Sequence, residues 1–118
     1  MIDKSLLAVG LTALVLAGCA NDPAPVEQMR LTEQAVAQAK AVGASEQVEE
    51  LKLAHEKLAL AEKNMGEADY KRARVLAEQA ELDARLAESK VLTLKSQEQL
   101  AELTARINRL RKQLGDQQ

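Results

Sequence analysis

YKRARVLAEQAELDARLAESKVLTLKSQEQLAELTARINRLRKQL, residues 70–114, is the stretch of sequence that decides the fold. It runs for 45 residues without a Gly or a Pro, and alanine, leucine and charged side chains dominate it. These are strong helix formers, so we predict one helix over residues 70–114. At 1.5 Å per residue this helix is about 68 Å long, and part of it has to project beyond any shorter helices that pack against it.

The first half of the predicted helix carries two apolar faces. The first face consists mostly of alanines: Tyr70, Ala73, Ala77, Ala80, Ala84, Ala87, Val91 and Leu94. The second face is made of Val75, Leu82 and Leu86. Alanines let helix axes approach closely, although each contributes less burial than a leucine. We therefore predict that this half buries itself between two shorter helices.

The second half repeats large aliphatic residues at alternating spacings of three and four, which is a heptad pattern. This apolar seam consists of Leu100, Leu103, Ile107, Leu110 and Leu114. The same register meets Ser89, Thr93 and Ser96 upstream, so the strong seam covers about two heptads. Five exposed aliphatic side chains are unusual on a lone domain. We infer that a protein partner or a second copy covers residues 96–114.

A cluster of positive charge accompanies the apolar seam. The basic cluster consists of Arg106, Arg109, Arg111 and Lys112. In a parallel homodimer Arg106 would face Arg111 of the other chain, and like charges there disfavour that pairing. The cluster suits an acidic partner helix, an antiparallel arrangement or an anionic surface. The alternative is that these residues only complement the carboxyl end of the helix.

Two shorter helical patterns precede the long one. The first covers residues 26–42 and stops at Gly43, and the second begins after Ser45 as its N-cap and runs to about residue 64. Asp69 is the predicted N-cap of the long helix. The predicted fold class is all-α, an antiparallel three-helix arrangement whose long third helix ends in a coiled-coil-like seam. Residues 26–95 form the helical bundle and residues 96–118 the projecting end.

The beginning of the chain has the layout of a cleavable secretory signal, predicted over residues 1–18. Its apolar run is shorter than the roughly 20 residues that a membrane-spanning helix needs. The run closes on Leu16, Ala17, Gly18 and Cys19. These residues resemble a bacterial lipobox, which implies that a signal peptidase recognises the first three. It also implies that Cys19 carries a diacylglyceryl group and an acyl chain such as palmitate. The alternative is a free, buried cysteine after an ordinary signal peptide.

The residues after the cysteine bear on which membrane holds the anchor. Residues 19–25 form the lipidated cysteine and a short tether that contains Pro23 and Pro25. In the lipoproteins that this segment resembles, an aspartate directly after the cysteine favours retention in the inner membrane. Ala20 occupies that place here, so the expectation is the periplasmic face of the outer membrane. Asp22 keeps the inner membrane as the alternative.

Composition argues against several classes of function. The chain has one Tyr, no Phe and no Trp, and its formal net charge is −2, so neither a nucleic-acid site nor a carbohydrate site is expected. We also expect no small-molecule substrate. The single histidine, His55, lacks a second histidine four residues on, and we expect a helix-surface residue and no metal site. Glu49 and Glu50 are adjacent and diverge on a helix, which indicates a solvated face. We predict no cofactor and no enzymatic activity.

Taken together, residues 19–114 resemble a family of small Gram-negative periplasmic lipoproteins of unknown function. The matching stretch is chiefly residues 26–90, with Gly66, Asp69 and Tyr70. The helical domain of that family also occurs fused ahead of OmpA-like peptidoglycan-binding domains, which makes an OmpA-like envelope protein one candidate partner. A second resemblance, to the major murein lipoprotein, rests on the lipobox and an alanine-rich heptad helix.

Two functional hypotheses follow from these expectations. In the first, the protein is a lipid-anchored, structural or partner-docking element of the periplasm that uses residues 100–114. In the second, it is an accessory or inhibitory subunit whose basic cluster binds an acidic surface of an envelope enzyme or transporter.

Overall fold

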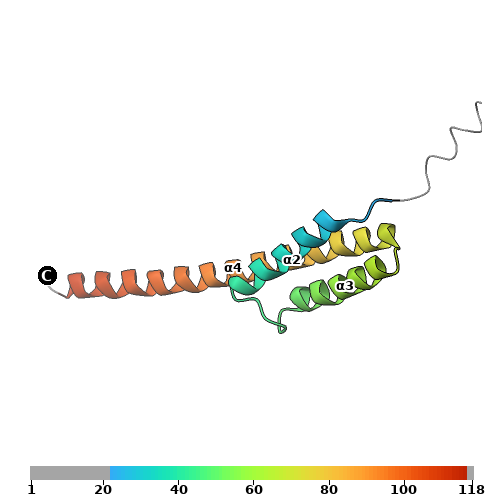
Figure 1. Cartoon of the computed structure of the whole chain (residues 1–118). Helices are drawn as coiled ribbons and strands as arrows, with labels where there is room; N and C mark the ends of the chain where they lie inside the picture. The colour runs from blue at the N-terminus through green and yellow to red at the C-terminus, as the bar shows by residue number, and fades with distance from the viewer. Residues whose placement is uncertain (1–21, 117–118) are drawn as a thin grey trace, which may run out of the picture.

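The protein is an all-helical, elongated three-helix molecule (Figure 1). The computed structural model describes residues 22–116, in which α2 spans Val26–Ala41, α3 spans Glu49–Gly66 and α4 spans Tyr70–Gly115. The predicted fold class, with its long third helix, is confirmed. The predicted signal over residues 1–18 and Cys19 lie outside the described residues.

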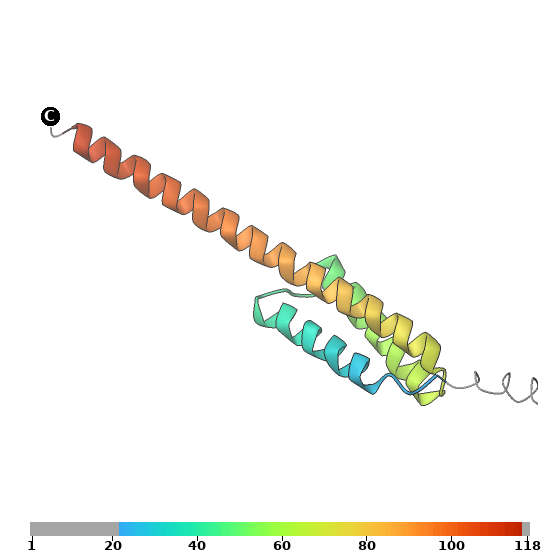
Figure 2. The same cartoon turned by 90° about the horizontal axis from the view of Figure 1, so that it is seen from above.

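The helices run up, down and up, so that α2 and α4 are parallel and α3 is antiparallel to both (Figures 1 and 2). Side-chain bonds at both ends of α2 show that it runs parallel to α4. Gln28 Nε2 donates to Glu81 Oε2 at 2.7 Å, and Lys95 Nζ donates to the carbonyl of Val42 at 2.6 Å. Both α2 and α3 therefore pack on the first half of α4, and the second half of α4 continues beyond them (Figure 2).

The end of α2 and the start of α4 form as the sequence predicts. Gly43 after α2 has φ of +101°, a conformation that glycine adopts readily, and the next amide, that of Ala44, donates back to the carbonyl of Ala39 at 2.9 Å. At the start of α4, Oδ1 of Asp69 accepts a hydrogen bond from the amide of Arg72 at 3.2 Å. Asp69 is thus the N-cap of α4, as predicted.

The predicted start of α3 is wrong by several residues. Ser45 does not cap the helix, because residues 45–48 form a separate turn in which the amide of Val48 donates to the carbonyl of Ser45 at 2.8 Å. Helix α3 starts at Glu49, and its N-cap residue Val48 offers no side-chain hydrogen bond. Two glutamates in its first turn face the positive end of the helix dipole and stabilise that end.

The core is built mainly from alanine. The inner face of α4, defined by its buried residues, consists of Ala73, Ala77, Ala80, Ala84, Ala87 and Val91. It meets Ala35 and Ala39 of α2 and Ala54 and Ala61 of α3, all of them buried. Leu51 and Thr32 are the largest fully buried side chains among residues 22–116. Small residues on all three helices let the helix axes approach closely. The close approach provides packing contacts that larger side chains would otherwise provide.

The predicted burial of the second face of α4 is wrong. Val75, Leu82 and Leu86 are exposed, with 47%, 66% and 48% of their surface accessible. Both shorter helices pack on the alanine side, where their own alanines and a few larger residues such as Leu51 face α4, and no described element remains to cover the larger side chains. The first half of α4 therefore buries one of its two apolar faces.

One buried polar contact ties α2 to α4. The hydroxyl of Thr32 lies 2.9 Å from the carbonyl oxygen of Gln28 in its own helix and 2.9 Å from that of Ala77 in α4. Thr32 is fully buried, so this hydroxyl proton is satisfied without water. Among residues 22–116 no helix is both long enough and apolar enough to cross a membrane.

Candidate docking surface on the long helix

The projecting half of α4 is exposed along its whole length. Every residue from 92 to 116 is exposed, and the apolar seam of residues 100–114 has between 48% and 67% of each side chain's surface accessible. The structure therefore leaves all five predicted seam residues uncovered by the described chain. A row of this kind on a continuous helix is suited to a partner helix, which would fit knobs into holes along it.

The exposed residues of the bundle continue the same seam. Each of Val75, Leu82 and Leu86 comes two residues after an alanine of the inner face, and two residues turn a helix by about 200°. They also share the seven-residue register of the seam, since Leu86 precedes Leu100 by 14 residues and Leu82 precedes Leu103 by 21. We call the eight residues the outer face: Val75, Leu82, Leu86, Leu100, Leu103, Ile107, Leu110 and Leu114.

The outer face was missed as a single surface in the sequence. Its signal is the heptad register, which runs through Ser89, Thr93 and Ser96 and joins the two apolar groups. Taken separately, the first group was assigned to the core and the second to a partner. Only the positions of α2 and α3, both on the alanine side, show that the two groups form one surface.

The basic cluster lies at the free end of α4, around the seam. Arg106 forms an ion pair with Glu102 one turn earlier, as the i,i+4 spacing favours. Arg109, Arg111 and Lys112 form no ion pair within residues 22–116. Their charges are exposed to solvent or to whatever binds the seam.

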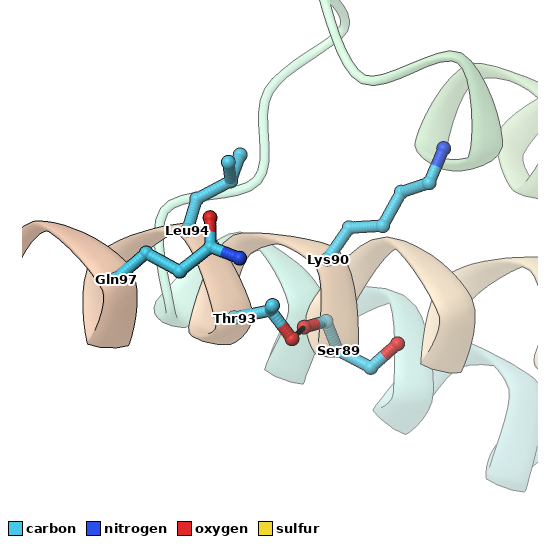
Figure 3. Close-up of a pocket in the computed structure, with 5 residues that line it drawn as sticks. All are labelled: Ser89, Lys90, Thr93, Leu94 and Gln97. Carbon is cyan, nitrogen blue, oxygen red and sulfur yellow. Dashed lines mark hydrogen bonds between the residues drawn. The ribbon is translucent and has the colours of Figure 1, made fainter.

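A shallow hollow lies where α4 leaves the bundle (Figure 3). It is lined by Ser89, Lys90, Thr93, Leu94 and Gln97 and has a volume of about 400 Å³. Its lining is largely hydrocarbon, and it opens widely to solvent. Ser89 and Thr93 point away from Leu94 and Lys90, so these side chains do not enclose a pocket (Figure 3).

The titratable groups of the bundle brace its helices. Lys90 donates to Glu50, and this hydrogen bond holds the pKa of the Glu50 carboxyl below its ordinary value. A hydrogen bond from Arg85, with a smaller effect from Gln28, likewise lowers the pKa of Glu81. Lys57 Nζ lies 2.5 Å from Asp83 Oδ2 and joins α3 to α4.

The single histidine contacts a glutamate in the turn that precedes its own helix. His55 Nδ1 lies 2.6 Å from Oε1 of Glu46 in the turn before α3, and its Nε2 is buried without a hydrogen-bond partner. Within the described chain no group of three or more histidine, cysteine, aspartate or glutamate residues is placed to hold a metal ion. The predicted peptidase-recognition residues Leu16, Ala17 and Gly18, and the lipidation residue Cys19, lie outside the described residues.

Comparison with known proteins identifies the family but no activity. Residues 27–103 match DUF4398, described as a domain of unknown function. A crystal structure of a DUF4398 family protein from Pseudomonas aeruginosa PAO1 is 67% identical in sequence. It matches with a TM-score of 0.79 over 81% of this chain and 100% of that chain. None of the curated proteins matches this sequence. The chain therefore belongs to the DUF4398 family.

Proposed function

We propose that this protein is a lipid-anchored component of the bacterial cell envelope that docks a protein partner through the apolar seam of α4. The observation that carries the proposal is the exposure of all five seam residues on a continuous helix that projects beyond its own bundle. The lipobox-like Leu16–Ala17–Gly18–Cys19 sequence supports an anchor on Cys19. Its following residue, Ala20, favours the periplasmic face of the outer membrane.

The fold separates the proposed anchor from the seam. The carbonyl of Pro23, within the tether, accepts a hydrogen bond of 3.0 Å from Arg74 near the start of α4. From Arg74 to Leu114 is 40 residues, or about 60 Å of helix. A lipid on Cys19 would therefore hold one end of a rigid rod and leave the seam at the other end.

A docking role fits the use of the charged residues better than a catalytic one. The side chains whose pKa values shift, Glu27, Arg30, Glu50 and Glu81, are all engaged with a neighbouring polar group on the bundle surface. We accordingly propose that the protein is not an enzyme. An OmpA-like envelope protein remains one candidate partner on the strength of the resemblance.

The docking proposal is tested by a double variant, Leu103→Asp with Ile107→Asp. The variant should no longer cross-link to or co-purify with any envelope protein that the wild type captures, while circular dichroism shows the bundle still folded. Ala101→Asp with Ala105→Asp is the matched control, because both residues are exposed on the same segment but lie off the seam. Equal capture by wild type and by the seam variant contradicts the proposal.

The anchor is tested separately. Cys19→Ser should abolish metabolic labelling with palmitate. The variant should appear either as soluble protein or as a precursor that still carries the signal peptide. Continued labelling of the Cys19→Ser protein would show that Cys19 is not the acylated residue.

A second function is favoured by the state of the basic cluster. Arg109, Arg111 and Lys112 form no ion pair within residues 22–116, so they are available to an acidic surface on an envelope enzyme or transporter. Such a complex weakens steeply between low and physiological salt, because screening shortens the reach of exposed charges. A complex whose affinity does not change with salt would instead rest on the apolar seam.

A further inference from the structure

We infer that the occupant of the outer face of α4 is a second copy of this chain, packed antiparallel to the first. The inference rests on the proposed docking function and names the partner. It starts from the observation that the seam and the exposed residues of the bundle form one surface in one heptad register. A single partner helix of the same length would cover all of it.

One antiparallel register pairs six of the eight outer-face residues with one another, while Leu100 lies level with Ser89 and Leu110 with Gln79 of the second copy. When Leu82 lies level with Ile107 of the second copy, Leu86 lies level with Leu103 and Val75 with Leu114. Every layer then joins an a position to a d position, as antiparallel coiled coils require, and all eight outer-face residues fall inside the overlap. A straight helix drifts by about 20° per heptad, and the left-handed supercoil of such a pair absorbs that drift.

The charges of α4 favour this orientation over the parallel one. In the antiparallel register the basic cluster lies level with the stretch that holds Glu78, Glu81 and Asp83 of the second copy, of which Glu81 and Asp83 already bond Arg85 and Lys57 of their own chain. A parallel pair in register would instead place basic cluster against basic cluster and these three carboxylates against their own copies. Like charges along a coiled-coil edge select against that pairing.

One like-charge contact remains in the antiparallel pair, between Arg85 and Arg106 of the second copy. Each of these arginines already has an acidic neighbour one turn earlier on its own helix, Glu81 at 2.6 Å and Glu102, respectively. The contact therefore joins two ion pairs, and the four side chains together are neutral.

The middle of the pair is polar, and two of its three hydroxyls are already hydrogen-bonded within their own helix. At the centre of the overlap Thr93 lies level with Ser96 of the second copy, and Ser89 lies level with Leu100. The hydroxyl of Ser89 donates to the carbonyl of Leu86 at 2.9 Å, and that of Thr93 donates to the carbonyl of Ser89 at 2.8 Å. Hydroxyls bonded within their own helix are covered by a partner with little penalty, and their small size lets the helices approach.

The pair has a definite relation to a membrane. The two tethers lie at opposite ends of the rod, because each Pro23 sits beside its own Arg74. Their separation is about 60 Å along the helix axis. A pair whose two chains are anchored in one membrane therefore lies along the surface.

Disulfide cross-linking tests the register directly. In the full chain carrying Cys19→Ser, which removes the native cysteine, Leu86→Cys and Leu103→Cys are introduced together. These residues are 17 positions or about 25 Å apart on one helix, so no disulfide forms within a chain. Mild oxidation should convert the double variant to a covalent dimer on non-reducing gels. The wild-type sequence with Cys19→Ser alone should sediment as a dimer at micromolar concentration.

The two single-cysteine proteins are the controls. In the proposed pair each introduced cysteine lies about 25 Å from its own copy, so neither Leu86→Cys nor Leu103→Cys alone should form the dimer. A dimer from either single variant shows a parallel or a shorter pair and overturns the inference. The layer of Leu82→Cys with Ile107→Cys provides a second double variant, in case the first loses its helical circular dichroism.

The outcomes separate this inference from the proposed function. If the Cys19→Ser chain sediments as a monomer and no double variant cross-links, the second copy is not the partner. The docking proposal is then decided by the separate capture experiment with Leu103→Asp and Ile107→Asp. If the covalent dimer forms while no other envelope protein is captured, the second copy is the partner that the seam requires.

Discussion

Replacing Ala87 by Leu tests whether the bundle depends on small side chains. Ala87 is fully buried in a cluster that also contains Ala35, Ala39, Ala54 and Ala84. Leucine adds three carbon atoms at a point where residues from all three helices meet, so α2 or α3 has to move outward. Overpacking of this kind costs about 1–3 kcal/mol of unfolding free energy. In a domain of this size each kcal/mol lowers Tm by roughly 4–8 °C.

The control is Ala101→Leu, the same substitution 14 residues later. Ala101 occupies the same heptad position on α4, but it lies in the projecting half and is exposed. Its change in stability should stay within about 0.5 kcal/mol. Urea unfolding followed by circular dichroism compares the two proteins. Equal midpoints for the two variants, or a more stable Ala87→Leu protein, would refute the view that close helix approach through alanine holds the bundle together.

Three further substitutions probe other contacts. Thr32→Val keeps the shape but removes the hydroxyl that reaches carbonyls of α2 and α4, and urea unfolding should show a loss of about 1 kcal/mol. Gly43→Ala should lower Tm in a thermal melt, because φ is +101° and the new methyl would lie 3.3 Å from Nζ of Lys95; an unchanged Tm would contradict this. The lowered pKa of Glu50, caused mainly by its bond from Lys90, stabilises the fold above about pH 4.5, and this stability is lost as pH falls through the lowered pKa. Glu50→Gln should therefore show a smaller drop in its urea midpoint between pH 7 and pH 3 than the wild type.

Much of the fold follows from local signals in the chain. A stretch of 45 residues that is rich in helix formers and lacks Gly and Pro favours one continuous helix, and α4 is this helix, from Tyr70 to Gly115. Gly43 and Asp69 end and start helices through backbone conformation and a single side-chain bond, both of which act within a few residues. Features that depend on four to seven consecutive residues were therefore predictable.

Features that depend on packing were not predictable to the same degree. Hydrophobicity alone favours burial of Leu82 and Leu86 over the alanines beside them, yet the alanines are buried. The burial is decided by α2 and α3, whose buried alanines, Ala35, Ala39, Ala54 and Ala61, complement the alanine face of α4. Thr32 was also missed as a core residue, because its partner carbonyl on Ala77 is 45 residues away in the sequence.

In the candidate site, too, the features set by local sequence were predictable and those set by packing were not. The five residues of the apolar seam were predicted from heptad spacing, and the structure leaves all of them exposed. The extension of that seam over the bundle was not predicted, since it depends on which side of α4 the shorter helices occupy. Ser45, assigned to a helix cap, lies in a turn whose closure involves Val48.

Substitutions on the inner face and on the outer face of α4 should have different effects in the cell. Folding uses the alanines of the inner face, whereas the outer face touches no other part of the described bundle core. A random screen of this helix should therefore yield two kinds of loss-of-function allele that do not overlap. Large residues at inner-face positions should lower the amount of protein in the cell, and charged residues at outer-face positions should leave abundance normal. Alleles of the second kind separate the protein's presence from its action.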